Sequence, residues 1–307
     1  MVSTARPRRM ALAGLIAVGA FALAGCASGD PLEAPAPDDT NSDTIVVGSQ
    51  AYYSNEIIAE IYAQALEASG FEVERQFNIG QREAYLPELE SGSVDLFPEY
   101  TGNLLQYYDE ATEARSTDDV YDALADALPD GLEVLDQAEA TDQDSYVVTK
   151  EFSDTNSVTS LADLAAVTTP LTLGGNSELE TRPYGPEGLQ SVYGVTVGFT
   201  PIEDSGGPLT IQALTENQVQ IVNIFSASPA IGTENLVVLE DPESLFLASH
   251  VVPLVNADIA DDIADVINAV QAELTAAELV DLNTRSSVDE ESSDTIATEW
   301  LTEKGLI

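Results

Sequence analysis

Aromatic residues stand next to several short apolar segments, and they are the residues best suited to chemistry in this chain. Tyr100 follows an expected strand over residues 94–97, Phe225 follows one over residues 219–224, and Tyr146 precedes a third apolar segment. Side chains at the ends of strands in an open α/β sheet converge on a cleft. Their rings attract a quaternary ammonium by about 0.5–2 kcal/mol each. A plain packing role for each ring remains the alternative.

Two charged residues could complete such a site. Arg182 is one of only seven basic residues after position 25, and its guanidinium could hold a carboxylate with two parallel hydrogen bonds. Asp144 lies two residues before Tyr146. A zwitterion with a quaternary ammonium at one end and a carboxylate at the other would suit both the rings and Arg182. The alternative for Arg182 is an ordinary surface ion pair.

The catalytic inventory is poor. His250 is the single histidine and Cys26 the single cysteine. The chain has no Gly-x-Ser-x-Gly, no His-Glu-x-x-His and no phosphate loop with lysine. Acidic residues are so numerous that a pair at glycosidase spacing carries no information. We therefore predict a binding protein and not an enzyme, with no cofactor and no metal site.

The N-terminal residues 1–25 have the pattern of a secretory signal peptide. Arg6, Arg8 and Arg9 precede a short apolar run and then small residues, and Cys26 follows directly. A cysteine at this place is the acceptor of a bacterial lipoprotein signal, and two acyl chains suffice to anchor a domain. We predict lipidation at Cys26, a disordered tether over residues 26–43, and an extracytoplasmic domain on the outer face of the membrane. A chance cysteine in an uncleaved segment is the alternative.

The chain is extremely acidic. It carries 10 basic and 54 acidic residues, for a net charge of −44, and loss of the first 25 residues would bring it to −47. This charge excludes nucleic acid as a partner. The acidic residues are spread along the sequence, which indicates a solvated surface suited to saline surroundings. The same field would favour the approach of cationic ligands.

Residues 44–97 alternate between strand and helix patterns. Residues 44–48 indicate a strand, followed by a helix that Ser54 caps and Gly70 ends. A strand over 71–77, a helix over 82–90 and a strand over 94–97 follow. This order predicts a parallel α/β sheet. Within the next turn we expect Pro98 to end the strand and Gly102 to permit a tight turn.

A second α/β pattern begins after Tyr146. Strands are expected at 147–148, 171–173, 196–200 and 219–224, and helices at 161–165, 185–193 and 209–215. From Val251 the chain is expected to be helical, with an apolar stripe over 259–274 and a capping box at Thr275 and Glu278. We expect these last helices to pack on the first lobe.

Several motifs resemble the osmoprotectant-binding proteins of ABC transporters, whose ligands are glycine betaine, choline, carnitine and related solutes. The resemblance covers about residues 44–303 and is most specific over 94–102. It rests on Gly48-Ser49 and on residues 77–83, 89–102 and 171–175. It implies an α/β, periplasmic-binding-protein-like fold of type II, with two α/β lobes joined by two hinge crossings. Lobe one would be residues 44–143 and 251–307, and lobe two residues 144–250.

The resemblance also implies a ligand-binding set. Tyr100, in the Glu-Tyr-Thr-Gly run, and Tyr146 match cage tyrosines, and Arg182 matches a carboxylate-binding arginine. Four positions depart from the family pattern or match it loosely, and they leave the identity of the ligand open. The expected ligand-binding residues are Gln50, Tyr100, Asn103, Asp144, Tyr146, Arg182, Phe225 and His250.

The implied function is that of a monomeric receptor which captures a quaternary ammonium solute between its lobes. It would deliver the solute to a membrane permease driven by an ATPase. A ligand-sensing lipoprotein of the same fold, with a different small polar solute, is the alternative. An extracellular hydrolase is a third. The loop over residues 204–208 could offer free amides to an anionic group, or could be a plain turn and helix cap.

Overall fold

The computed structural model describes residues 44–307. The expected signal peptide over residues 1–25, the lipid acceptor Cys26 and the tether over residues 26–43 lie outside the described residues. Within residues 44–307, no helix is both long enough and apolar enough to cross a bilayer.

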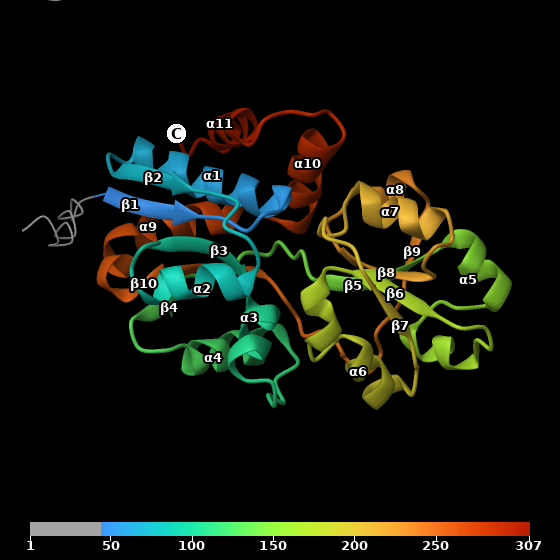
Figure 1. The fold of residues 1–307 in the computed structure, drawn as a ribbon. Coiled ribbons are helices and arrows are strands. Elements are labelled where there is room, and N and C mark those ends of the chain that lie inside the picture. The colour runs from blue at the N-terminus through green and yellow to red at the C-terminus, as the bar shows by residue number, and fades with distance from the viewer. Residues whose placement is uncertain (1–43) are drawn as a thin grey trace, which may run out of the picture. The chain divides into compact units, whose positions relative to one another are not determined.

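The first of two five-stranded sheets has the order β2-β1-β3-β10-β4 (Figure 1). The first three strands along the chain are parallel, as the sequence pattern predicts, and β10 runs antiparallel to both of its neighbours. The strands are β1 (Thr44–Gly48), β2 (Glu72–Gln76), β3 (Leu96–Tyr100), β4 (Leu132–Val134) and β10 (Val251–Asn256).

Helices cover both faces of this sheet. On one face the buried side chains of α1, among them Ile57 and Ile61, pack with Ile263, Ile267 and Trp300 of the last helices. The prediction that the C-terminal helices pack on the first lobe is therefore confirmed. Helices α2, α3 and α4 cover the other face. The helices are α1 (Tyr53–Ala68), α2 (Arg82–Glu90), α3 (Thr101–Tyr108), α4 (Thr117–Ala127), α9 (Ala257–Glu273), α10 (Ala276–Ser287) and α11 (Ser293–Lys304).

The second sheet has the order β7-β6-β8-β5-β9, which repeats the arrangement of the first. Strands β6, β7 and β8 are parallel, and β5 is antiparallel to β8 and β9. Its strands are β5 (Asp144–Thr149), β6 (Thr172–Gly175), β7 (Gly198–Pro201), β8 (Ile221–Phe225) and β9 (Leu236–Val238). Its helices are α5 (Lys150–Asn156), η1 (Leu161–Ala166), η2 (Ser177–Thr181), α6 (Pro186–Gly188), η3 (Leu189–Tyr193), α7 (Pro208–Thr215) and α8 (Ala230–Thr233).

Two crossing segments join the sheets, residues 135–143 between β4 and β5 and residues 239–250 between β9 and β10. They run side by side near the first sheet. Thr141 pairs with His250 in an antiparallel bridge, and the Thr141 hydroxyl donates to the Ser249 carbonyl at 2.6 Å. Paired crossings of this kind allow two lobes to move as a hinge.

The turn after the third strand differs from the prediction. Pro98 lies inside β3 opposite Pro253 of β10, and Gly102 lies in the first turn of α3. The Pro98 carbonyl accepts from the Asn55 amide, and the Pro253 carbonyl from the Leu135 amide. Both prolines thus present their polar edge away from the shared ladder, where a missing N–H costs no bond between β3 and β10.

One helix start and one strand were also predicted wrongly, and one capping box is only half formed. Tyr52, and not Ser54, precedes α1, and the Ser54 hydroxyl is buried in the first turn. The segment that begins at Val251 is a buried strand before it becomes helical. Thr275 accepts from the Glu278 amide as a cap, but the Glu278 carboxylate binds Trp300 and Lys304 and does not return to Thr275.

Candidate functional site

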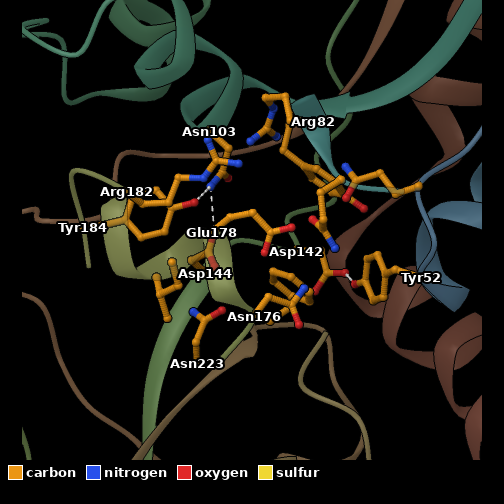
Figure 2. Close-up of a pocket in the computed structure, with 15 residues that line it drawn as sticks. Tyr52, Arg82, Asn103, Asp142, Asp144, Asn176, Glu178, Arg182, Tyr184 and Asn223 are labelled. Carbon is orange, nitrogen blue, oxygen red and sulfur yellow. Dashed lines mark hydrogen bonds between the residues drawn. The ribbon is translucent and has the colours of Figure 1, made fainter. Parts of the chain in front are cut away.

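A cavity lies where the carboxyl ends of strands from both sheets meet (Figure 2). Strands β1, β3, β6 and β8 all lead into it. Its empty volume of about 560 Å³ includes the open mouth. The lining residues are Gln50, Tyr52, Gln81, Arg82, Tyr100, Asn103, Asp142, Asp144, Asn176, Glu178, Leu179, Arg182, Tyr184, Asn223 and Phe225.

Four aromatic rings line this cavity. Tyr52 precedes α1 and Tyr100 ends β3 in the first lobe, whereas Tyr184 lies between η2 and α6 and Phe225 ends β8 in the second lobe. The Tyr52 and Phe225 rings lie 4.8 Å apart between centroids and are tilted by 47°. The Tyr184 hydroxyl accepts from the Asn103 amide at 3.1 Å, which fixes the ring at the contact between the lobes. Rings from both lobes can therefore enclose one cation.

Two buried aspartates stand at the first crossing. Asp142 accepts hydrogen bonds from the Tyr52 hydroxyl and from the Ala227 amide, so it links both lobes. Burial raises the pKa of the Asp142 carboxyl to about 7; the Ala227 amide opposes this rise, and the Asp144 charge adds to it. Burial also raises the pKa of Asp144, against hydrogen bonds from Asn223 and Asn103 that lower it.

Glu178 is the third carboxylate of the lining, and it comes from the short helix η2 after β6. Its Oε2 atom is shielded from solvent and has no hydrogen-bond partner among the described residues. Figure 2 shows Glu178 on the same cavity as Asp142 and Asp144. Because a buried acceptor without a partner is costly, this oxygen is suited to a donor on a ligand.

Arg82 begins α2 and is held by Glu99. Its Nε and Nη2 atoms donate to the two Glu99 oxygens at 2.8 and 2.9 Å. Burial alone would lower the pKa of Arg82, but the charges of Glu99 and Tyr85 keep it well above its ordinary value. Glu99 also accepts from the Tyr85 hydroxyl and the Tyr100 amide. This buried pair therefore fixes the end of β3 and with it the Tyr100 ring.

Arg182 lies on the opposite side of the cavity, in the second lobe. Its Nη2 atom forms an ion pair with Glu83 of α2 at 2.7 Å, which joins the two lobes. The Glu83 side chain is 51% exposed and that of Arg182 only 16%. The expected carboxylate clamp is therefore at the cavity, but it already has a carboxylate from the protein itself.

Asn103 makes further contacts between the lobes. Its side-chain amide donates to Asp144 at 2.6 Å and to the Tyr184 hydroxyl at 3.1 Å (Figure 2). Its carbonyl accepts from the Ser249 hydroxyl of the second crossing. Asn103 thus contacts both lobes and one hinge segment at once.

The structure brings six of the eight expected ligand-binding residues to one cavity: Gln50, Tyr100, Asn103, Asp144, Arg182 and Phe225. Gln50 donates its side-chain amide to the Tyr85 hydroxyl at 3.2 Å, so it supports the Arg82 and Glu99 pair. Phe225 is the last residue of β8, as its place in the sequence suggests.

Tyr146 and His250 do not line the cavity. Tyr146 is fully buried in β5, where its hydroxyl donates to the Tyr184 carbonyl and its ring packs on Phe246. Through this hydrogen bond Tyr146 fixes the backbone of Tyr184, which does line the cavity. Tyr146 lies two residues further along the same strand than Asp144, which does line the cavity.

The His250 ring lies in the second crossing, on the side of α4. Nδ1 is 3.0 Å from the Ala138 carbonyl, and Nε2 is 3.2 Å from the Thr117 hydroxyl. The His250 backbone exchanges hydrogen bonds with Thr101. His250 therefore fastens the two crossings to the first lobe and makes no contact with the cavity lining.

Sequence reasoning missed several lining residues, but the same signals could have found some of them. Tyr52 follows β1 as Tyr100 ends β3, and Tyr184 stands two residues after Arg182. Asp142 precedes Asp144 by the same spacing. Glu178 carried no signal, because one acid among 54 cannot be singled out by type.

The loop over residues 204–208 is a helix cap. The Asp204 carboxylate accepts from the Leu209 amide at 2.6 Å and from the Thr210 amide at 3.2 Å. The first amides of α7 are thus occupied by the chain's own carboxylate, which rules against the anion-binding alternative.

The arrangement suits capture of a small cation. It has rings for an ammonium, carboxylates for its charge and amide groups from both lobes. Within residues 44–307, no cluster of three or more His, Cys, Asp and Glu side chains is arranged to hold a metal ion.

Fold and site together define a type II solute-binding protein, in which two α/β lobes enclose a ligand at the hinge. Residues 43–303 match the family model described as the substrate-binding domain of an ABC-type glycine betaine transport system. The chain belongs to this family, whose members are extracytoplasmic receptors of ABC importers.

Known relatives are similar over most of their length. The glycine betaine-binding protein YehZ of Escherichia coli K12 is 25% identical, over 90% of this chain and 93% of that protein. The glycine-betaine-binding protein of Pseudomonas aeruginosa is 23% identical, over 87% of this chain and 89% of that protein. A solved structure of a glycine betaine/carnitine/choline ABC transporter protein superposes with a TM-score of 0.69 at 18% identity, covering 85% of this chain and 99% of that one. This last likeness shows the shared fold.

Proposed function

We propose that this receptor captures a quaternary ammonium compatible solute, such as glycine betaine, choline or carnitine, in the cavity between its lobes. The observation that carries the proposal is the convergence of Tyr52, Tyr100, Tyr184 and Phe225 on one cavity that also holds carboxylates. A trimethylammonium group offers no hydrogen bond, so ring faces and negative charge are the groups that bind it. Four rings at about 0.5–2 kcal/mol each can supply micromolar affinity together with burial.

The binding cycle needs motion between the lobes. We assign residues 44–143 and 251–307 to lobe one and residues 144–250 to lobe two, each moving as a rigid unit about the two crossings. The contacts of Asn103 with Asp144 and Tyr184 support closure around a ligand, because they form only when the lobes meet. Release would follow when the transporter favours the open form.

The proposal includes the membrane context. We propose lipidation at Cys26 after removal of residues 1–25, so that the receptor works as a lipid-anchored monomer on the outer face of the membrane beside a permease and its ATPase. The order of charged, apolar and small residues before Cys26 supports this. The two curated relatives bear names that say they bind glycine betaine.

Calorimetric titration with glycine betaine, proline betaine, carnitine and choline tests the proposal. We expect one-to-one binding of at least one of these solutes. Tyr100→Ala should weaken it by about tenfold or more, since it removes one ring of the cage. Tyr121→Ala is the matched control, because Tyr121 lies in α4 and does not line the cavity. A folded protein that binds none of the four would refute the proposal.

A further inference from the structure

The charges around the cavity are unbalanced in favour of a cation. Three carboxylates line it, those of Asp142, Asp144 and Glu178, against the two guanidiniums of Arg82 and Arg182. A zwitterionic ligand would need at least one guanidinium for its carboxylate. The cavity can therefore bind the carboxylate of a zwitterion only if Arg82 or Arg182 is not already paired with a protein carboxylate.

Arg82 is committed to another carboxylate. Glu99, which is fully buried and does not line the cavity, takes its Nε and Nη2 atoms in a two-pronged pair. Breaking a buried pair of this kind leaves an uncompensated charge and is strongly unfavourable. Arg82 thus contributes shape to the cavity while its charge is already matched.

Arg182 is also engaged. Its partner Glu83 does not line the ligand cavity, but lies on a neighbouring hollow that is also lined by Glu110 and Tyr107. The ion pair reaches across the two lobes at 2.7 Å. As long as Glu83 holds the guanidinium, a ligand carboxylate must compete with a protein carboxylate for it.

The third observation is the unpartnered Oε2 atom of Glu178. A carboxylate on the ligand cannot satisfy it, because it offers no donor and carries the same charge. A hydroxyl on the ligand can donate to it, and a bond from a neutral donor to a carboxylate is stronger than one between neutral groups.

We propose that the cavity selects a cationic ammonium alcohol such as choline over a zwitterionic betaine. Glu178 accepts the ligand hydroxyl, and Glu83 acts as a positioning residue that keeps Arg182 from binding a carboxylate. This inference rests on the proposed function, since it assumes that the rings hold a quaternary ammonium. It goes further by assigning the other end of the ligand.

Choline and glycine betaine are a matched pair for the test, because both carry a trimethylammonium group and differ only in a hydroxymethyl against a carboxylate. In calorimetric titrations choline should bind about tenfold more tightly or better. Betaine binding as tightly as choline, or more tightly, overturns the inference and leaves the proposed function standing. If neither ligand binds, the inference is refuted, and the proposed function then depends on the titrations with carnitine and proline betaine.

Two variants test the roles of Glu83 and Glu178 separately. Glu83→Gln frees Arg182, so betaine affinity should rise about fivefold or more while choline affinity changes less than about twofold. Glu178→Gln should weaken choline by about tenfold and spare betaine. Glu110→Gln, in the same hollow as Glu83 but without a pair to Arg182, is the control for a general loss of negative charge. An equal effect of Glu83→Gln and Glu110→Gln on betaine would show that Glu83 has no specific role.

Discussion

Ionisation of Asp142 should make the ligand affinity of the cavity depend on pH. Its raised pKa, about 7, means that the carboxyl is mostly neutral at pH 6 and mostly ionised at pH 8. Since the ionised form attracts a cation, the affinity for choline should rise by about tenfold between pH 6 and pH 8. Calorimetric titration at several pH values measures this. Asp142→Asn should flatten the profile, and an unchanged pH dependence in that variant would assign the effect to another group.

Glu99 is the residue on which the first-lobe side of the site depends. It accepts hydrogen bonds from Arg82, Tyr85 and the Tyr100 amide, and it is fully buried. Glu99→Ala should lower the free energy of unfolding by about 3–5 kcal/mol, because Arg82 would keep a buried charge without a partner. Urea denaturation measures the change. Glu72→Ala on exposed β2 is the control and should stay within about 0.5 kcal/mol.

Among individual residues, the sequence predicted those that stand at the ends of strands. Tyr100 and Phe225 were found because side chains at strand ends face the cleft. The same rule placed Tyr146 wrongly, because that residue lies inside β5, behind Tyr184. The partners of Arg82 and Arg182 could not be predicted, because ion pairs between distant segments depend on the packing of whole lobes.

Helix α3 packs tightly against the second crossing at Gly102. A Cβ atom at Gly102 would lie 2.7 Å from the Ala248 carbonyl oxygen and 2.9 Å from Leu247 Cβ. Gly102→Ala must therefore push the crossing away, and it should lower the free energy of unfolding by about 1–3 kcal/mol. Denaturation curves measure this. Gly232→Ala in α8, where a Cβ would meet nothing within 4 Å, is the control, and an equal loss in both variants would contradict the expected clash.

The alternating elements of each lobe were predicted well where strand and helix patterns follow each other closely, as over residues 44–97. Strand β10 was missed. Its Pro253 argues against a strand in sequence, and only the pairing with Pro98 shows that the missing N–H is harmless there. Such a pairing joins residues far apart in the chain, so no local pattern reveals it.

The whole molecule carries a net charge of −44, and its mutual repulsion should make stability depend on salt. Raising sodium chloride from 0.1 to 1 M shortens the screening length from about 10 to 3 Å. The thermal midpoint should rise by about 4–8 °C, or roughly 2 kcal/mol for a chain of this size. Sodium sulfate at equal ionic strength should raise the midpoint at least as much, because sulfate is also excluded from the protein surface. A midpoint that stays constant or falls with sodium chloride would contradict this interpretation of the acidic surface.

Closure of the two lobes assembles the ligand site. The rings, the carboxylates and Asn103 come from both lobes, so the complete site exists only when the lobes meet. Binding of a ligand should therefore stabilise the closed arrangement as a whole.

The measurement that tests the central claim most directly compares choline with 3,3-dimethyl-1-butanol, its uncharged carbon analogue of the same shape. If the cavity recognises a quaternary ammonium by its charge, choline binds one-to-one and about 100-fold more tightly than the analogue. Equal affinity for the two would mean that the rings form a plain apolar pocket, and it would contradict recognition of the ligand by its positive charge.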